Sequence, residues 1–242
     1  MTAYSEEFTC VYDALNGERI TDCAAHEFAR GRNCVRRRAD VHSNSGRGTL
    51  KLALIGTHGV GKTTLAYETC SLLKKAHYNV ELVTEVARQS PFPVNAATTI
   101  EGQLWILHAQ IAAELDASRH APHVICDRSV LDNYCYLVNK FGRQPQLESW
   151  LEWWMESYAL LVGVPSAFDE ITPDGFRSED RIFQHRIHDL LNELLSAPPF
   201  SRIRKNVIWL ESSDRHAWGE RIFAAALPLL EANAPLQKSA AR

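Results

Sequence analysis

A short glycine-rich stretch contains the residue types that bind phosphate groups. In GTHGVGKTT, residues 56–64, four residues match the pattern Gly-x-x-x-x-Gly-Lys-[Ser/Thr]: Gly56, Gly61, Lys62 and Thr63. The glycines let the backbone N–H groups face phosphate oxygens, with the positive end of the following helix behind them. We expect Lys62 to reach the β- and γ-phosphates and the Thr63 hydroxyl to bind Mg²⁺.

The strand-like run before the loop and the helical stretch after it favour nucleotide binding over a plain glycine-rich turn. The residues predicted to bind the nucleotide are Gly56, Thr57, His58, Gly59, Val60, Gly61, Lys62, Thr63 and Thr64.

A second group of candidate residues follows the apolar run HVIC. Asp127 comes directly after this run, at the position where a nucleoside triphosphatase holds its magnesium ion. We expect Asp127 to bind Mg²⁺ together with Thr63; it could also cap the following helix, and the two roles are compatible. Arg128 could reach a phosphate group of either substrate or pair with a neighbouring carboxylate.

A third group, Glu85 and Arg88, follows the run NVELVT. In a kinase, a carboxylate such as Glu85 at the end of a strand can accept the proton of an attacking hydroxyl or help to organise the metal. A surface salt bridge is the alternative.

A fourth group occurs in PDGFRSEDRIFQHR, where a turn-forming Pro-Asp-Gly precedes Arg177, Arg181 and Arg186. Segments of this kind can close over phosphates and stabilise the charge that develops during transfer. We take Arg177 as the catalytic candidate, while a solvated loop and helix face is the alternative, more so for Arg186.

Short apolar runs alternate with amphipathic stretches from residue 49 onward, which predicts a parallel sheet covered by helices. The predicted strands are residues 50–55, 79–84, 123–127, 159–164 and 206–210. Five strands joined by helical crossovers indicate a doubly wound α/β sheet, and ligands of such sheets bind at the carboxyl ends of the strands. All four groups of candidate residues fall at or near such ends.

The predicted helices have recognisable boundaries. Thr98 and Glu101 have capping-box spacing at the start of one helix, and residues 129–141 form another that stops at Gly142. Further helices are predicted over residues 147–158 and 183–195, and a last one, capped by Ser213 or Asp214, runs to about Leu230. In the helix over 147–158, Trp150, Trp153 and Trp154 share one face, so core packing is favoured over stacking on a substrate ring.

The composition limits the class of protein. The 242 residues are 45% hydrophobic and 23% charged, which is typical of one globular core with an appendage. We predict an appendage and linker over residues 1–48 and a nucleotide-binding domain over 49–242. The net charge of −3 makes a nucleic-acid partner unlikely, and the basic cluster Arg36–Arg38 is more typical of a solvated run.

The six cysteines and the N-terminus indicate a cytoplasmic protein with reduced thiols. The N-terminus lacks signal-peptide features, and no apolar run is long enough to cross a bilayer. Residues of the appendage that could in principle bind zinc are Cys10, Cys23, His26, Cys34 and His42. Because they include no Cys-x₂-Cys pair, we do not predict a zinc site.

Over residues 50–230, the chain resembles a P-loop kinase-like ATPase family that includes ribosylnicotinamide kinase domains and TRPL-translocation-defect proteins. The resemblance rests on GTHGVGKTTL, TEVAR, ICDRS, DGFR and NVIWLESS. It implies a five-stranded sheet of the P-loop nucleotide-kinase type, with Mg²⁺-ATP as phosphoryl donor and a small hydroxyl-bearing acceptor. The triplet Asp127-Arg128-Ser129 departs from the Asp-Thr-Asp of ribosylnicotinamide kinases and is more similar to thymidylate and deoxynucleoside kinases, which leaves the acceptor open.

Two functions are compatible with these features. The first is an ATP-dependent kinase acting on a hydroxyl of a nucleoside- or nucleotide-like acceptor, with Lys62, Glu85, Asp127, Arg128 and Arg177 as catalytic residues. The second is a nucleotide-dependent regulatory binding protein, or an ATPase without transfer to a small molecule. The candidate base Glu85 favours the kinase, since a switch needs a magnesium ligand but no base. No guanine-specific Asn-Lys-x-Asp motif is present, and the oligomeric state stays open.

Overall fold

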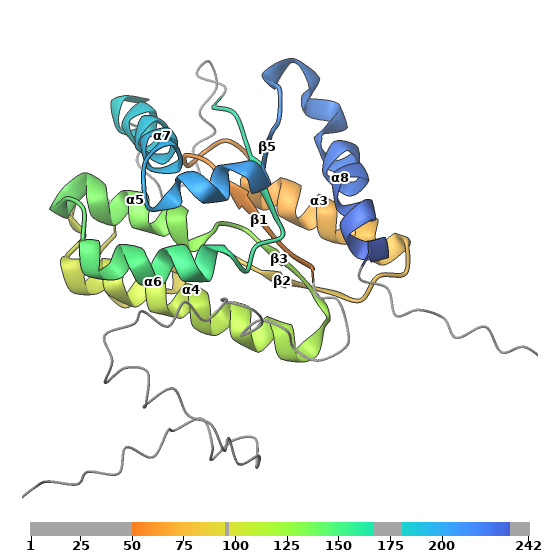
Figure 1. The fold of residues 1–242 in the computed structure, drawn as a ribbon, viewed down its shortest axis with the longest axis horizontal. Coiled ribbons are helices and arrows are strands. Elements are labelled where there is room, and N and C mark those ends of the chain that lie inside the picture. Colours follow the sequence, from red (N-terminus) through yellow and green to blue (C-terminus); the bar gives the residue numbers. More distant parts are fainter. Residues whose placement is uncertain (1–49, 95–96, 167–180, 233–242) are drawn as a thin grey trace, which may run out of the picture. The chain divides into compact units, whose positions relative to one another are not determined.

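The computed structural model describes residues 50–94, 97–166 and 181–232, which form a parallel sheet with helices on both faces (Figure 1). The strands are β1 (Leu50–Ile55), β2 (Val80–Val83), β3 (His123–Cys126), β4 (Leu160–Gly163) and β5 (Val207–Trp209). Their order in the sheet is β2-β3-β1-β4-β5, and all four neighbouring pairs are parallel. The predicted α/β class and the five strands are confirmed, whereas the predicted appendage over residues 1–48 lies outside the described residues.

Successive side chains of β1 alternate between two separate hydrophobic cores. Leu52 and Leu54 pack with the helices on one face of the sheet, while Ala53 and Ile55 pack with those on the other. All four side chains are fully buried, as expected for a central strand of a sheet that is covered on both faces.

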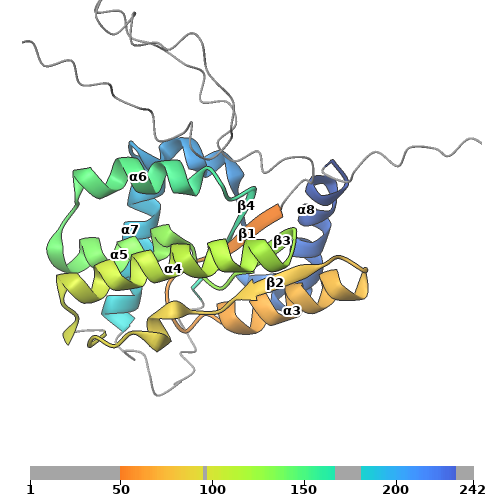
Figure 2. The same ribbon diagram turned by 90° about the horizontal axis from the view of Figure 1, so that it is seen from below.

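The helices divide between these two faces, as Figures 1 and 2 show. One face is covered by α3 (Lys62–Lys75) and α8 (Trp218–Ala232). The other is covered by α4 (Ile100–His120), α5 (Val130–Phe141), α6 (Pro145–Met155) and α7 (Arg181–Ser196). Three short 3₁₀ segments complete the described elements: η1 (Val86–Gln89), η3 (Phe200–Asn206) and η4 (Ser212–Ala217). No helix within these ranges is long and apolar enough to span a membrane.

Four predicted helix starts differ from the structure: α6 and α7 each begin two residues before the predicted 147 and 183, and the predicted caps of two other helices are wrong. Helix α4 is capped by Thr99, whose side chain accepts a hydrogen bond from Gly102 N, so the cap lies one residue beyond the predicted Thr98. The last helix, α8, begins at Trp218, because the residues around Asp214 form η4 instead. At α4 two threonines are neighbours, and local sequence does not decide which of them caps the helix; at α8 neither candidate is the cap, because both belong to η4.

The tryptophans of α6 pack against the protein, as predicted. Trp154 is buried and donates a hydrogen bond from Nε1 to Glu114. Trp150 and Trp153 are partly buried against the same core, and Trp150 also stacks on His108.

The sheet order places the candidate residues at one edge. Strands β1 and β3 are neighbours, so the loop that follows Ile55 and the residues that follow Cys126 leave the sheet side by side. Asp127 extends the ladder by one bond, donating from its backbone N–H to Val83 O of β2. This edge, formed by the carboxyl ends of the strands, contains the candidate functional site.

Candidate functional site

The glycines of the phosphate loop (residues 56–64) adopt conformations that other residues rarely reach. Gly56, Gly59 and Gly61 have φ values of 143°, 73° and 89°. A Cβ atom on Gly56 would also lie 2.7 Å from Val164 O of the neighbouring strand connection. Gly61 caps α3, whose first turn contains no acidic residue. The loop therefore presents the positive end of a helix without a competing carboxylate from that turn, as an anion-binding loop requires.

Lys62 and Thr63, the first two residues of α3, lie in the candidate site. Lys62 is buried and donates from Nζ to Gly56 O at 2.9 Å and to Thr57 O, so its ammonium group lies within the curve of the loop. The Thr63 hydroxyl donates to Asp127 Oδ2 at 2.6 Å. The two predicted magnesium ligands are therefore adjacent, although 64 residues separate them in the chain.

Asp127 is not the cap of the following helix. The N-cap of α5 is Ser129, which forms a reciprocal capping box with Asp132. The carboxylate of Asp127 therefore faces Thr63 instead of the helix terminus.

The donor set of Thr63 and Asp127 fits magnesium better than zinc. Both are oxygen donors, and Mg²⁺ is commonly held by one or two protein groups together with phosphate oxygens and water. Within the described ranges no cluster of three or more His, Cys, Asp or Glu side chains could hold a metal by itself. A site with one hydroxyl and one carboxylate is compatible with a metal that arrives with a nucleotide.

Glu85 forms a buried ion pair with Arg128. Arg128 Nε donates to Glu85 Oε1 at 2.8 Å, and Arg88 Nε donates to Oε2 at 3.0 Å. Glu85 and Arg128 are 4% and 3% exposed, and their contact is the pairing with a neighbouring carboxylate that was the alternative given for Arg128. The Arg88–Glu85 pair, with Arg88 42% exposed, is nearer to the surface salt bridge considered for Glu85. The Arg128 guanidinium also lies over the Tyr136 ring, 5.5 Å from its centroid.

The surroundings of Arg128 are strongly anionic. Burial by itself would lower the pKa of Arg128, but Tyr136 and the carboxylates of Asp132 and Asp127 outweigh that effect and raise it. Arg128 is therefore a permanent cation at the floor of the site. Its Nη1 atom is buried and has no hydrogen-bond partner in the described part of the chain.

A pocket of about 270 Å³ joins these groups. It is lined by Gly59, Gly61, Lys62, Thr63, Thr64, Glu85, Arg88, Asp127, Arg128 and Arg215. Four of these side chains are cationic and two are carboxylates, so the lining is suited to a polyanion that brings its own metal ion. Most of the predicted site residues within the described ranges thus share one pocket.

The remaining predicted residues lie elsewhere. Gly56, Thr57, His58 and Val60 are buried and do not line the pocket, so they support the phosphate loop through packing and backbone contacts. The predicted catalytic Arg177 lies outside the described residues. Arg186 pairs with Glu193 on the exposed side of α7, which is the solvated role considered for it.

Two residues that the sequence did not single out support the phosphate loop. Asp132 Oδ1 accepts a hydrogen bond from Gly56 N at 2.8 Å, while its other oxygen accepts from Ser129. Gln184 of α7 donates from Nε2 to His58 O at 2.7 Å, and its backbone carbonyl accepts from the Thr57 hydroxyl at 2.9 Å. The capping-box spacing of Ser129 and Asp132 was readable in the sequence, but no local signal points to Gln184.

Arg215 is the third residue that sequence reasoning missed. It belongs to η4, lines the pocket, and places Nη2 3.0 Å from where a Cβ on Gly61 would be. Its guanidinium lies over the Trp218 ring, 5.6 Å from the centroid. Since η4 follows β5 at the carboxyl edge of the sheet, the rule used for the other strands would have included this segment.

Comparison with known proteins agrees with this geometry. Residues 51–209 match the family model described as AAA domain. Among solved structures, deoxyadenosine kinase from M. mycoides with bound dATP superposes with a TM-score of 0.53 at 16% identity, covering 74% of this chain and 99% of that one. NadR protein in complex with NR superposes with a TM-score of 0.57 at 17% identity, covering 81% of this chain.

The chain spans about half of NadR, 54% of its length. No curated protein sequence matches the chain. At these identities the two solved structures establish the fold, while the family rests on the match over residues 51–209. The chain belongs to the AAA domain family and has a P-loop kinase-like fold.

Proposed function

We propose that the protein is an ATP-dependent kinase that transfers the γ-phosphoryl group to a hydroxyl of a nucleoside- or nucleotide-like acceptor. The observation that carries this proposal is the shared pocket in which the phosphate loop and the Thr63–Asp127 pair lie with the buried carboxylate of Glu85. A nucleotide switch needs the first two of these features but has no use for the third. A kinase uses all three.

In this proposal, each group of pocket side chains has its own role. Lys62 and the N–H groups of the phosphate loop would bind the β- and γ-phosphates. Thr63 and Asp127 would hold Mg²⁺, which supplies charge neutralisation at the phosphate oxygens when bound. Arg128, a buried cation that lines the pocket, would stabilise the negative charge of the phosphate oxygens.

Glu85 would accept the proton of the attacking hydroxyl. Each of its two oxygens receives one hydrogen bond from a guanidinium group, and the remaining lone pairs are what a general base requires. The same two bonds fix the direction of the carboxylate, so that positioning contributes to catalysis as well as basicity.

The class of acceptor is supported by two independent features. The triplet Asp127-Arg128-Ser129 is similar to that of deoxynucleoside kinases, and one structural relative is a deoxyadenosine kinase. The other relative was solved in complex with NR. A nucleoside or nucleotide hydroxyl is the acceptor chemistry common to these observations.

The test is a panel of nucleosides, deoxynucleosides, nucleotides and ribosylnicotinamide incubated with Mg²⁺-ATP and read by ADP release. We expect one class to raise ADP release above the acceptor-free rate and to yield a phosphorylated product by mass spectrometry. Lys62→Ala is the control, since it should remove both Mg²⁺-ATP binding and transfer. Tight Mg²⁺-ATP binding with no transfer to any member of the panel would favour the regulatory binding protein instead.

A further inference from the structure

A buried carboxylate on α4, outside the pocket lining, lies at the centre of a hydrogen-bond network. Glu114 is 1% exposed, and each of its oxygens accepts two hydrogen bonds. Its four donors are Lys51 Nζ at 2.7 Å, Gln110 Nε2 at 2.9 Å, Trp154 Nε1 at 2.8 Å and the Tyr158 hydroxyl at 2.5 Å. A carboxylate with four donors has a single orientation, because any rotation would break several bonds at once.

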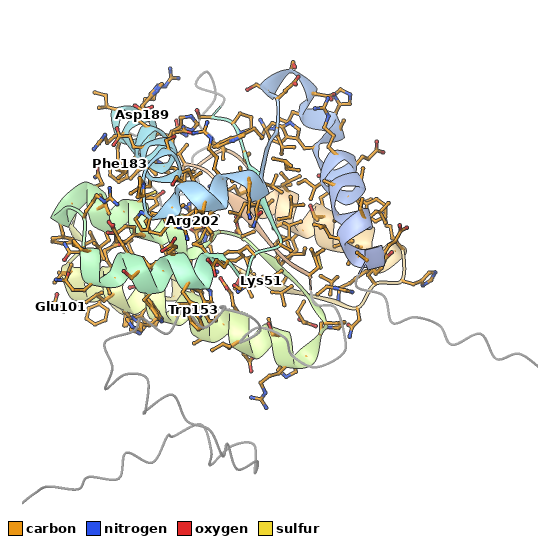
Figure 3. All side chains as sticks on the ribbon, in the orientation of Figure 1. Lys51, Glu101, Trp153, Phe183, Asp189 and Arg202 are labelled. Carbon is orange, nitrogen blue, oxygen red and sulfur yellow. The ribbon has the colours of Figure 1, made fainter. Side chains whose placement is uncertain are left out.

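The cation of this network is enclosed by aromatic rings. Lys51 Nζ lies 4.3 Å from the Trp154 ring centroid and 4.5 Å from that of Tyr158, and its side chain is 11% exposed. Figure 3 labels Lys51 on β1 and Trp153, the neighbour of Trp154, on α6. The Lys51–Glu114 pair therefore joins the sheet to α4 and α6 as a paired, largely buried charge.

Two members of the network continue to the turn that carries Arg128. Gln110 Nε2 also donates to Arg128 O at 3.1 Å, and the Tyr158 hydroxyl also accepts from Val130 N at 3.2 Å. The orientation of the Gln110 amide is determined, because Glu114 Oε1 and Arg128 O are both acceptors and only an NH₂ group can face them. Glu114 thus reaches both sides of the turn through one intermediate residue on each side.

The turn has a conformation that needs such support. Arg128 has a φ of 121°, which side-chain-bearing residues rarely adopt. This backbone directs the buried guanidinium to Glu85 at the floor of the pocket. Without the bonds to Arg128 O and Val130 N, the turn could relax toward negative φ and carry the guanidinium away from Glu85.

We propose that Glu114 is a positioning residue for the phosphoryl-transfer site, acting through Gln110 and Tyr158 to hold Arg128 against Glu85. Its effect on turnover rests on the kinase function proposed above. Its effect on the geometry of Arg128 does not, so the two can be tested separately.

Each variant interrupts one connection between Glu114 and the Arg128 turn, or the ion pair at its centre, without leaving a buried charge unpaired. Gln110→Met removes the donor to Arg128 O and also an amide oxygen that has no partner within the described ranges. Tyr158→Phe removes the acceptor for Val130 N. The double variant Lys51→Met/Glu114→Gln removes the central ion pair as a unit.

A matched control exists in the same fold. Tyr134 is fully buried like Tyr158, its hydroxyl donates to the buried Glu148 at 2.6 Å, and it accepts from Gln144 N at 2.7 Å. That backbone group belongs to the connection between α5 and α6, where no pocket residue lies. Tyr134→Phe therefore has the same chemical change and a similar loss of stability without a bond to the Arg128 turn.

The first readout is the side-chain Nε–Hε signal of Arg128 in ¹⁵N NMR of the full chain, assigned by its loss in Arg128→Lys. The ion pair with Glu85 should protect this proton in the native protein. We expect Gln110→Met and Tyr158→Phe to speed its exchange with water by roughly tenfold or more, and Tyr134→Phe to leave it unchanged. The Lys51→Met/Glu114→Gln variant should behave like the first two.

The second readout is steady-state kinetics with the acceptor found in the panel. Both single variants should lower kcat by roughly tenfold with little change in KM for ATP. The double variant Gln110→Met/Tyr158→Phe should lower kcat by less than the product of the two single reductions. Arg128 exchange that is equally fast in Tyr158→Phe and Tyr134→Phe, or unchanged in every variant, would overturn the proposal. If no acceptor is phosphorylated, the exchange measurement alone decides it.

Discussion

At the scale of single residues, Glu85 has to serve in two interactions. It pairs with Arg128 and Arg88 and is also the carboxylate proposed to take the proton of the acceptor. Because both partners donate hydrogen bonds to it, replacing the carboxylate should affect chemistry and local structure together. The measurement must therefore separate turnover from ATP binding.

Replacing Glu85 by Gln should lower kcat by roughly 10²-fold, because the amide keeps the shape of the side chain but cannot accept a proton. The affinity for Mg²⁺-ATP, measured by calorimetry, should change little. Glu81→Gln, on β2 and outside the pocket lining, is the control and should be close to native. Native turnover in Glu85→Gln would remove Glu85 as the base and leave Asp127 as the other carboxylate of the pocket.

Arg215 should contribute to nucleotide affinity. Its guanidinium lies beside Gly61 and is exposed, so a phosphate contact there would be screened by solvent. We expect Arg215→Ala to weaken Mg²⁺-ATP binding by roughly three- to tenfold, more at low salt than at high salt, and Arg215→Lys to restore part of the loss. Arg204→Ala is the control, since Arg204 bonds to Ser196 outside the pocket. Equal affinities in the Arg215→Ala and Arg204→Ala variants would contradict the assignment.

At the scale of elements, the carboxyl ends of β1 and β3 position the site, because the phosphate loop follows β1 and the Asp127-Arg128-Ser129 triplet follows β3. The opposite ends of these strands are joined by a side chain: His123 Nδ1 accepts from Leu50 N at 3.3 Å. Burial lowers the pKa of His123, which favours the neutral ring that this acceptor role requires. A histidine whose pKa falls on folding makes stability dependent on pH.

The sign of that dependence follows from the lowered pKa. Above the unfolded pKa of about 6.5 the ring is neutral in both states, and the stabilising contribution is fully present. As the pH falls below that value toward the lower folded pKa, the unfolded state takes up the proton first, and the contribution is lost. We expect the free energy of unfolding by urea to fall more between pH 7.5 and 5.5 in the native protein than in His123→Asn, which offers an acceptor but does not titrate. Parallel curves for the two proteins would show that His123 is not responsible.

At the scale of the whole molecule, the described residues form one sheet with a layer of helices on each face. Both buried cores are built from residues between Leu50 and Leu230. Within the described ranges, the residues that line the pocket lie between Gly59 and Arg215. The predicted domain over residues 49–242 is therefore proposed to fold by itself.

Removal of residues 1–45 should leave folding and nucleotide binding largely unchanged. The reason is that the described residues from Leu50 onward already supply two buried cores, a five-stranded sheet and the pocket. The truncated protein should melt cooperatively within a few degrees of the full chain and bind Mg²⁺-ATP with an affinity within about twofold of it. Insoluble protein, or a broad non-cooperative transition, would show that the segment is part of the folded core.

The local features of this protein were readable in its sequence. The phosphate loop is a contiguous motif, and the five strands are short apolar runs whose burial follows from their composition. The packing of Trp154 followed from one-face helical spacing. These features depend on residues within one or two turns of each other, so periodicity and motif spacing are sufficient to predict them.

The contacts that assemble the site were decided by the tertiary structure. Thr63 meets Asp127, and Glu85 meets Arg128, because the sheet order is β2-β3-β1-β4-β5, and no local pattern specifies that order. The same holds for Gln184 and Arg215, which reach the loop and the pocket from far along the chain, and for Gln110 of α4, which donates to Arg128 O. The sequence by itself determined which residues could bind phosphate, while their partners depended on packing between distant segments, whose energies are small individually and act only in the complete fold.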